Sequence, residues 1–548
     1  MFDGYATVWE AIADVIPDAP VAIQGERRDT WGELEDRAAR LAGALAAHGV
    51  GPGTHVALYL FNCPEYAEVV FACLKLRAVP ANVNFRYRAS ELVALLDNAD
   101  AEVVVYHQAL ADRVAAALPQ LPKLRLLISI DDDTDDLEGQ AREVASVPGA
   151  FEYHRLVTTH EPAPRIPRDG HDHLLWYTGG TTGLPKGVIW EQGTLLGFGL
   201  AYSSALLDQP TPTNAHEVAT AARALVDEGR QLVTLLTTPQ VHATAAYQLH
   251  TTLSYGGALA LLPRGRVDGD EICRVIERER VTVLSVVGDT VLRRTVDALV
   301  RAEEHGTPYD ISSLRRVHGS GAFSQVASKD ALHARTPMTF YDSLGASEAV
   351  GFGLSLTSSP GEAATARFRL GANARVLDEH DHDVTPDSGD AGVLAVSVSS
   401  GIGYYNDPER SAATFRDVDG VRYAILGDWA IPHADGTITL LGRGSSCINT
   451  GGEKVWPEEV EEALKAHPAV IDAVVVGVPD PEWGESVAAV VAARPVGDAL
   501  PAPEELGKFV ASQLASYKQP RRVVLVDEVQ RTTVGKVDYE WAREQLTT

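Results

Sequence analysis

The chain has 548 residues, several times the length of a typical single domain, which favours more than one domain. Hydrophobic residues make up 45% and charged residues 22%, a globular balance that excludes a disordered or fibrous protein. With 47 basic and 75 acidic residues the formal net charge is −28, which disfavours non-specific binding to nucleic acid or anionic lipid.

The first half of the chain alternates helical and strand patterns. Residues 31–48 carry apolar side chains at helical spacing, residues 55–60 are typical of a buried strand, and residues 64–77 predict a second helix. Further apolar runs predict strands at Val103–Tyr106, Leu124–Ile130, Ala258–Leu262 and Val281–Val287. The acidic run Asp131–Asp136 predicts a solvated loop. Because helices separate the strands, we expect an α/β fold.

The composition changes at residues 440–455, where glycines and small polar residues interrupt the strand pattern. Beyond this stretch we predict two helices and three strands, at 457–466, 470–478, 487–493, 503–516 and 521–526. We therefore expect a large N-terminal multi-sheet α/β domain over residues 1–442 and a small mobile C-terminal α+β domain over residues 443–548. Glycine tolerates large backbone changes, so a hinge is expected near residues 443–446.

The cysteines and the N-terminus predict the compartment. Four cysteines lie far apart in the sequence, which disfavours a disulfide framework or a zinc site and favours a reducing compartment. The N-terminal residues resemble no signal peptide, and no apolar run is long enough to span a membrane. We expect a cytoplasmic protein with no membrane span.

The strongest chemical signal is the segment Tyr177–Gly187, which holds four glycines, three threonines and one lysine. Glycines allow close backbone approach to phosphate, hydroxyls and amides donate hydrogen bonds, and a lysine adds positive charge. It is not a Walker A loop, because Lys186 stands between Pro185 and Gly187. The predicted phosphate-binding residues are Thr178, Gly179, Gly180, Thr181, Thr182, Gly183 and Lys186.

This segment resembles the phosphate-loop signature of the adenylate-forming (ANL) superfamily of acyl-CoA synthetases, adenylation domains and luciferases. Other motifs follow in the family's order over nearly the whole chain, and several phrases look most like actinobacterial steroid- or fatty-acyl-CoA synthetases. The resemblance implies adenine contacts at Gly319, Ser320, Gly321 and Ala322, and a block that ends in a magnesium-associated glutamate at Asp342, Leu344, Gly345, Ser347 and Glu348.

The resemblance also implies residues for the rest of the reaction. Asp428 would bind ribose, Arg443 would lie at the hinge, and Lys536 would be the catalytic lysine. A coenzyme A channel is implied at Gly451, Gly452, Glu453 and Trp483, although Trp483 is as readily explained by core packing. His242 stands where the family often has a residue that gates the acyl site; a structural role for this histidine is an equal alternative.

The chemistry explains these residue types. A carboxylate that attacks the α-phosphorus of ATP brings two anions together, so cations and donors must be aimed at the developing charge. Lys536 suits the reacting groups, and Lys186, Thr181 and Thr182 suit the departing phosphates. Glu348 suits Mg²⁺, which accepts few protein oxygens and keeps phosphate ligands.

The resemblance also implies an acyl site, and the sequence departs from the family pattern at three positions. The resemblance places the acyl site along Trp190–Leu207, around residues 239–243 and before Leu344, and small residues there indicate room for a bulky terpenoid, steroid-like or fatty acid. Leu344 replaces a common tyrosine, Ser445 a hinge aspartate or lysine, and Asn449 a common lysine. These changes indicate lineage drift or a weakened half-reaction.

We expect an ATP-dependent, AMP-forming acid–thiol ligase that uses ATP, Mg²⁺ and coenzyme A. One alternative is an enzyme specialised for a single half-reaction, either with a partner adenylating enzyme or with adenylation for a carrier protein. A luciferase-type oxygenase is a further alternative within the fold. Outside this class, a nucleotide-sensing binding protein is the main alternative, and the presence of both Glu348 and Lys536 argues against it. A homodimer is compatible with the sequence.

Overall fold

The computed structural model describes most of the chain. The described residues are 2–131, 147–180, 183–263, 267–320, 324–362, 367–399, 401–443, 448–450, 453–480, 484–495, 499–514, 516–531 and 537–547. The predicted acidic loop therefore lies outside them except for Asp131, which is exposed.

The N-terminal part contains two large sheets. Among the described residues, one sheet has eight strands in the order β19-β9-β8-β4-β3-β5-β6-β7. Strands β4, β3, β5, β6 and β8 run parallel to their neighbours, whereas β9 returns antiparallel to β8. The bounds are β3 His55–Tyr59, β4 Val79–Asn82, β5 Val103–His107, β6 Leu126–Ile130, β7 Phe151–Glu152, β8 His173–Gly180, β9 Gly183–Glu191 and β19 Gly403–Tyr404.

The second sheet has fourteen strands among the described residues, in the order β17-β18-β21-β22-β16-β15-β14-β13-β12-β10-β11-β1-β2, with β20 on β21. Strands β10 to β14 form its parallel centre. The bounds are β1 Pro20–Gln24, β2 Arg27–Thr30, β10 Val233–Leu236, β11 Ala258–Leu261, β12 Val283–Val287, β13 Arg316–Ser320, β14 Thr339–Leu344, β15 Gly353–Thr357, β16 Arg367–Leu370, β17 Ala374–Leu377, β18 Gly392–Ser397, β20 Phe415–Val418, β21 Val421–Pro432 and β22 Thr437–Arg443.

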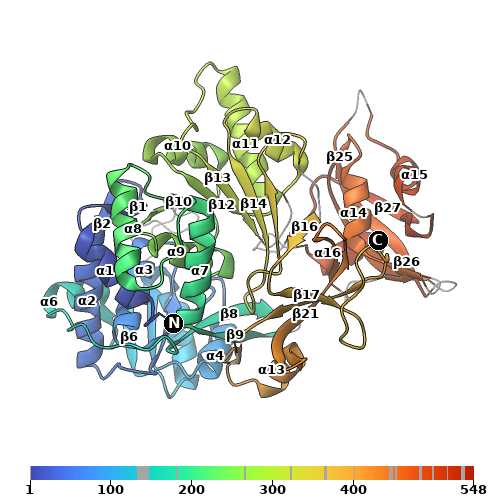
Figure 1. Ribbon diagram of the computed structural model, residues 1–548. Helices are drawn as coiled ribbons and strands as arrows, with labels where there is room; N and C mark the ends of the chain where they lie inside the picture. The colour runs from blue at the N-terminus through green and yellow to red at the C-terminus, as the bar shows by residue number, and fades with distance from the viewer. Residues whose placement is uncertain are drawn as a thin grey trace.

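Helices cover both faces of the parallel part of each sheet (Figure 1). A central layer packs between the two sheets and consists of α1 Tyr5–Val15, α2 Trp31–Ala47, α3 Pro64–Lys75, α6 Tyr153–Thr159, α7 Gln192–Leu207, α8 Ala215–Asp227 and α9 Ala243–Leu253. The outer layers are α4 Ala89–Asn98 and α5 Ala111–Ala117 on one side, and α10 Gly269–Glu279, α11 Asp289–Glu304 and α12 Val326–His333 on the other. A short helix, α13 Pro408–Thr414, packs beside β19.

The period of two along the parallel strands explains this layering. In β3, Val56 and Leu58 enter the central core, while Ala57 and Tyr59 enter the core under α4 and α5. A strand that is buried on both faces is apolar at every position, which is how residues 55–60 appear in the sequence. Local signals also position the helices: Thr30 accepts a hydrogen bond from the Glu33 backbone N–H, and the Glu33 carboxylate accepts one from the Thr30 backbone N–H, which starts α2.

The C-terminal part forms its own sheet and cores. Among the described residues it has the order β24-β23-β26-β25, with β27 on β26. Helices α14 and α15 cover one face, and α16 covers the other. The bounds are β23 Ile448–Thr450, β24 Glu453–Val455, α14 Pro457–Lys465, β25 Val470–Asp480, β26 Gly484–Ala493, α15 Pro503–Gln513, β27 Arg522–Val526 and α16 Tyr539–Thr547.

The predicted fold class is confirmed, with a large N-terminal α/β part and a smaller C-terminal one. Each helix and strand predicted above is present, with ends shifted by at most a few residues. The exact domain boundary and the hinge stay predictions, because residues 444–447 lie outside the described ones. Within the described residues, no helix is both long enough and apolar enough to cross a bilayer.

Candidate active site

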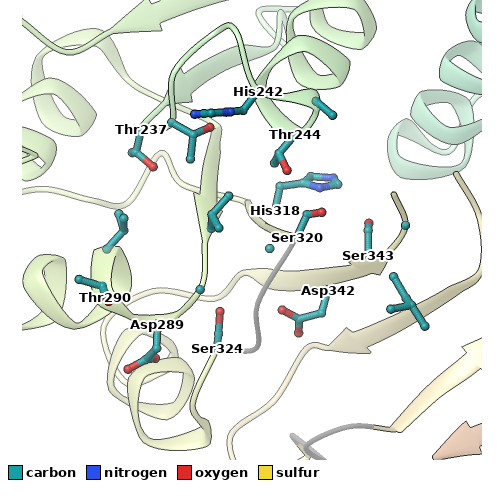
Figure 2. Close-up of a pocket in the computed structure, with 18 of the residues that line it drawn as sticks. Thr237, His242, Thr244, Asp289, Thr290, His318, Ser320, Ser324, Asp342 and Ser343 are labelled. Carbon is teal, nitrogen blue, oxygen red and sulfur yellow. The ribbon is translucent and has the colours of Figure 1, made fainter. Parts of the chain in front are cut away.

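A continuous cleft of about 3680 Å³ extends across the carboxyl ends of β13 and β14 to the C-terminal part. In open α/β sheets this edge is where ligands generally bind. Figure 2 shows His242, His318, Ser324 and Asp342 around the same pocket. At the far end, Gln325 Nε2 donates a hydrogen bond to the backbone oxygen of Ile471, which joins the two parts of the chain beside the cleft.

The predicted phosphate segment forms a β-hairpin. Thr178 of β8 lies opposite Lys186 of β9, and both line the cleft. At the base of the hairpin a Cβ on Gly187 would lie 2.6 Å from Tyr177 Cζ, so a glycine is required there. The Tyr177 hydroxyl donates to Asn98 Oδ1 at 2.7 Å, which fixes the ring. Gly179, Gly180 and Gly183 also lie on the two strands, while Thr181 and Thr182 lie outside the described residues.

Lys186 and Glu348 meet around one tyrosine. The Tyr404 hydroxyl donates to Glu348 Oε1 at 2.6 Å, and Lys186 Nζ lies 5.0 Å from the centre of the Tyr404 ring. Strand β19 pairs Tyr404 with Val188 of β9, which brings this tyrosine next to the hairpin. A carboxylate beside a lysine that is predicted to bind phosphate suits a Mg²⁺ ion that keeps phosphate and water ligands. The described residues contain no group of three or more potential metal-binding side chains, so Glu348 would act without a protein cage.

The predicted adenine segment lies beside a buried ion pair. Gly319 of β13 pairs with Asp342 of β14, and a Cβ on Gly319 would lie 2.5 Å from Asp342 Oδ1. The other Asp342 oxygen is 2.5 Å from Lys329 Nζ, and both side chains are buried. Ser324 Oγ is buried without a hydrogen-bond partner in the described structure and lines the cleft next to Asp342, where it suits a polar ligand.

The rest of this block follows the predicted order. Ser320 and Leu344 end neighbouring strands, and both line the cleft with Gly345 and Ser347. The Ser347 carbonyl accepts a hydrogen bond from Trp190 Nε1 at 2.8 Å, which anchors the loop before Glu348. Gly321 and Ala322 lie outside the described residues.

The predicted ribose aspartate lies opposite the predicted hinge arginine, since Asp428 of β21 pairs with Arg443 of β22. Asp428 lines the cleft together with Glu458, the second residue of α14. Glu458 packs directly on Gly442, where an added Cβ would lie 2.1 Å from the carboxyl carbon. Burial, with the negative charges of Glu461 and Asp428, raises the pKa of Glu458 to about 8.

His242 precedes the first residue of α9 and lines the cleft, as the acyl-site prediction requires. The neighbouring wall is formed by Tyr202 of α7, Tyr247 of α9 and His318 of β13. Tyr202 and His318 are directly hydrogen-bonded through the phenol oxygen and Nε2. The predicted acyl segment around residues 190–207 is therefore part of the cleft wall.

Several predicted residues cannot be located. Lys536, Gly451, Gly452 and Trp483 lie outside the described residues, as does Ser445. For Arg443, Glu453 and Asn449, the strand assignment is described and the side chain is not. The residues on either side of the Lys536 segment, Arg531 and Val537, line the cleft.

The sequence-based prediction missed Tyr404, Lys329 and Glu458. Tyr404 lies 56 residues from Glu348, and its place beside the hairpin depends on the pairing of β19 with β9, which no local sequence pattern predicts. Lys329 follows helical spacing on α12 and is indistinguishable in sequence from a surface lysine. Glu458 belongs to an acidic first helical turn, where exposed carboxylates are common.

Comparison with known proteins shows the family of the chain. Residues 9–405 match the AMP-binding enzyme family, and residues 459–536 match the AMP-binding enzyme C-terminal domain. A medium/long-chain-fatty-acid–CoA/3-oxocholest-4-en-26-oate–CoA ligase of Mycobacterium tuberculosis is 39% identical over 98% of this chain and 95% of its own. The 3-oxocholest-4-en-26-oate–CoA ligase of Rhodococcus rhodochrous is 37% identical over 98% of this chain and 95% of its own.

Solved structures show the same fold. The anthranilate CoA ligase AuaEII in complex with anthranoyl-AMP has a TM-score of 0.81 at 20% identity, covering 99% of this chain and 97% of that one. A benzoate CoA ligase from Burkholderia xenovorans LB400 has a TM-score of 0.77 at 23% identity, covering 98% and 99%. The chain belongs to the AMP-binding enzyme family of the adenylate-forming superfamily.

Proposed function

We propose that the protein is an acyl-CoA synthetase that joins a carboxylic acid to coenzyme A through an acyl-adenylate, with ATP converted to AMP and pyrophosphate. The observation that supports this most directly is the meeting of Lys186, Tyr404 and Glu348 at the glycine-rich hairpin, in a cleft shared with Asp342 and Asp428. Full-length similarity to CoA ligases supports the same reaction.

The proposed roles follow from charge and reach. Thr178 and Lys186 would hold the β- and γ-phosphates, and the Tyr404 hydroxyl would orient Glu348. Mg²⁺ bound at Glu348 would neutralise phosphate charge. Asp428 would accept hydrogen bonds from the ribose hydroxyls, and Asp342 would accept one from the adenine amino group. Arg443 would lie at the hinge.

Lys536 is the proposed catalytic lysine, at the carboxylate and the α-phosphate. Its motif and the cleft-lining residues on both sides of its segment support this role. The thiol would then enter beside Gly451, Gly452, Glu453 and Trp483 and attack the acyl-adenylate, with AMP as the leaving group. His242 would gate the acyl site.

The proposed acid is large and mostly apolar, of the steroid-like, terpenoid or fatty class. The two relatives compared above are named for fatty-acid and steroid-acid substrates. We also propose a cytoplasmic enzyme, because Cys73 and Cys273 are buried free thiols. Sedimentation tests whether the protein is a homodimer. The separate assay of each half-reaction, described below, tests whether a partner enzyme makes the adenylate.

The experiment is a product analysis of the purified full chain with ATP, Mg²⁺ and fatty, aromatic, steroidal and diterpenoid acids, with and without coenzyme A. Mass spectrometry would follow acyl-AMP and acyl-CoA separately. We expect acyl-AMP without coenzyme A and acyl-CoA with it. Acyl-CoA formed only from a supplied acyl-adenylate would contradict the complete reaction and indicate a partner adenylating enzyme.

The roles are tested by two variants and a control. Lys536→Ala should slow adenylate formation about 100-fold or more, the usual loss for a charged group aimed at the transition state. Glu348→Gln should slow it similarly and raise the Mg²⁺ concentration required. Lys508→Ala changes an exposed lysine of α15 and should leave both half-reactions unchanged. Unaltered adenylation in Lys536→Ala would remove that residue from catalysis.

A further inference from the structure

One part of the cleft wall is polar without being charged. It consists of Tyr202, Tyr247, His318 and Ser343, which come from α7, α9, β13 and β14 and which all line the cleft. The rings of Tyr202 and His318 are 5.2 Å apart, and those of Tyr202 and Tyr247 are 6.2 Å apart. Figure 2 shows His318 and Ser343 among the side chains around the pocket. We call these four residues the polar wall.

The polar wall holds no charge at physiological pH. Burial, together with the positive charge of Arg316, lowers the pKa of His318 to about 3, so the imidazole is neutral. The Arg316 guanidinium itself donates to the Leu206 carbonyl. Burial raises the pKa of the Tyr202 and Tyr247 hydroxyls above their ordinary value, so both keep their protons. None of the four side chains of the polar wall would therefore serve as a counter-ion for a charged substituent on the acyl group.

The wall has unused hydrogen-bonding capacity. The Tyr202 hydroxyl contacts His318 most closely through Nε2 and lies 3.3 Å from Nδ1, and the Ser343 side chain hydrogen-bonds to Tyr202. A neutral imidazole carries one donor and one acceptor, and a single hydroxyl can satisfy only the nearer of the two well, so the other ring nitrogen can serve a ligand group. Tyr247 also lines the cleft, and its hydroxyl can donate or accept a hydrogen bond. Polar groups that lose water without gaining a partner are costly, so a pure hydrocarbon acyl group is poorly matched to this surface.

The polar wall also closes the part of the cleft that it lines. Behind Tyr202, Gln248 and His318 lies a second cavity of only about 20 Å³. A space of that size holds about one water molecule and no acyl carbon chain. The acyl group therefore ends against the wall or turns away from it.

The wall lies near the reacting end of the substrate. Ser343 precedes Gly345 by two residues, and Gly345 belongs to the block proposed to contact the adenylate. Two residues of a strand cover about 7 Å. We therefore expect an atom in contact with Ser343 and Tyr202 to lie about 7 Å from the adenylate end of the acyl group.

We propose that Tyr202 and His318 are specificity-determining residues that favour an acid bearing a hydroxyl or keto oxygen no more than about 7 Å from its carboxyl carbon. The oxygen would accept from the imidazole N–H or a tyrosine hydroxyl, or donate to the Tyr202 or Ser343 oxygen. This inference rests on the proposed function and narrows its substrate class.

The test uses acids in matched pairs that differ only by the oxygen. The pairs are benzoate and 4-hydroxybenzoate, cyclohexanecarboxylate and 4-oxocyclohexanecarboxylate, and decanoate and 4-oxodecanoate. Acyl-CoA formation gives kcat/KM for each acid. We expect the wild-type protein to favour the oxygenated member of an accepted pair by about tenfold, the value of one good hydrogen bond.

Tyr202→Phe keeps the ring and removes the hydroxyl. It should lower kcat/KM for the oxygenated acid about tenfold and leave the unsubstituted acid within about twofold. His318→Leu should act in the same direction, and His318→Gln should retain part of the preference. Tyr255→Phe is the control. The buried Tyr255 hydroxyl is hydrogen-bonded to Ser204, which lies on α7 as Tyr202 does, but neither Tyr255 nor Ser204 lines the cleft.

The results separate the two proposals. Equal rates for both members of every accepted pair, or a Tyr202→Phe variant that changes both members alike, would overturn the role of the polar wall while the synthetase activity stands. Absence of acyl-AMP and acyl-CoA from every acid, the steroidal and fatty ones included, would overturn the proposed function itself.

Discussion

Lys329 holds its ammonium group 2.5 Å from the Asp342 carboxylate, with both side chains buried beside Gly319. The ion pair fixes one carboxylate oxygen and leaves the other directed at Gly319, on the side of the cleft proposed for adenine. Lys329 is therefore a positioning residue for Asp342. Lys329 itself is not among the residues that line the cleft, whereas its partner Asp342 is.

The first prediction concerns Lys329→Met. It leaves a buried carboxylate without its counter-charge, so the free energy of unfolding should fall by about 3 kcal/mol and the KM for ATP should rise. Urea unfolding and steady-state kinetics measure both. Lys329→Arg should restore most of the ATP affinity.

A second substitution distinguishes positioning from simple packing. The double variant Lys329→Met/Asp342→Asn removes both charges and should regain most of the stability lost in Lys329→Met. The ATP affinity should stay low, since the proposed adenine acceptor has changed. Additive losses in stability would contradict coupling between the two side chains.

The second prediction concerns Tyr404→Phe, which removes the hydroxyl that donates to Glu348. A hydrogen bond to a charged group contributes about 1.5–3 kcal/mol, so kcat/KM for adenylate formation should fall about 10- to 100-fold. The Mg²⁺ concentration for half-maximal rate should rise, because Glu348 loses its fixed orientation. Pyrophosphate release at varied Mg²⁺ concentration measures both effects.

The adjacent tyrosine is a matched control for this variant. The Tyr405 hydroxyl donates to Asp100 at 3.0 Å, away from Glu348. Tyr405→Phe should therefore leave the Mg²⁺ dependence unchanged. If both variants shift it equally, the effect belongs to the β19 strand rather than to the Tyr404 hydroxyl.

The sequence predicts the helices and strands better than it predicts which distant side chains meet at the site. The patterns at residues 31–48 and 55–60 predict α2 and β3, because periodicity and capping act over a few residues. The glycines and Lys186 predict a phosphate loop for the same local reason. Tyr404 and Lys329 could not be predicted, since the partner of each lies in a distant segment of the chain, and strand order is set by packing of the whole domain.

The third prediction tests the base of the phosphate hairpin. Gly187→Ala places a methyl group 2.6 Å from the Tyr177 ring, which is already fixed by its hydrogen bond to Asn98. Such overpacking costs about 1–3 kcal/mol, and displacement of the hairpin should raise the KM for ATP. Gly51→Ala, with nothing within 4 Å of the added carbon, is the control and should change neither quantity. Unchanged stability in Gly187→Ala would show that the Tyr177 ring can move freely.

The fourth prediction is a pH dependence of the contact between the two parts of the chain. The pKa of Glu458 is raised from 4.5 to about 8, first by burial and then by Glu461 and Asp428. At a pH between these two pKa values, Glu458 holds a proton when the C-terminal part is packed against the N-terminal part, which we call docking. A Glu458 that is exposed to solvent would release that proton. Docking should therefore weaken as the pH rises from 4.5 to about 8 and then level off.

Glu458→Gln imitates the protonated side chain and should remove this pH dependence, making docking at neutral pH stronger than in the wild type. Trp429 and Trp456 report on the contact, because their rings lie 5.8 Å apart across the two parts of the chain. Their fluorescence should change with pH in the wild type and remain constant in Glu458→Gln.

The control is Glu504→Gln, which changes an exposed residue of α15 and should show the same pH response as the wild type. A pH response that persists in Glu458→Gln would assign it to another group at the contact, and Lys465, which lies beside Glu461 on α14, would then be the next residue to replace.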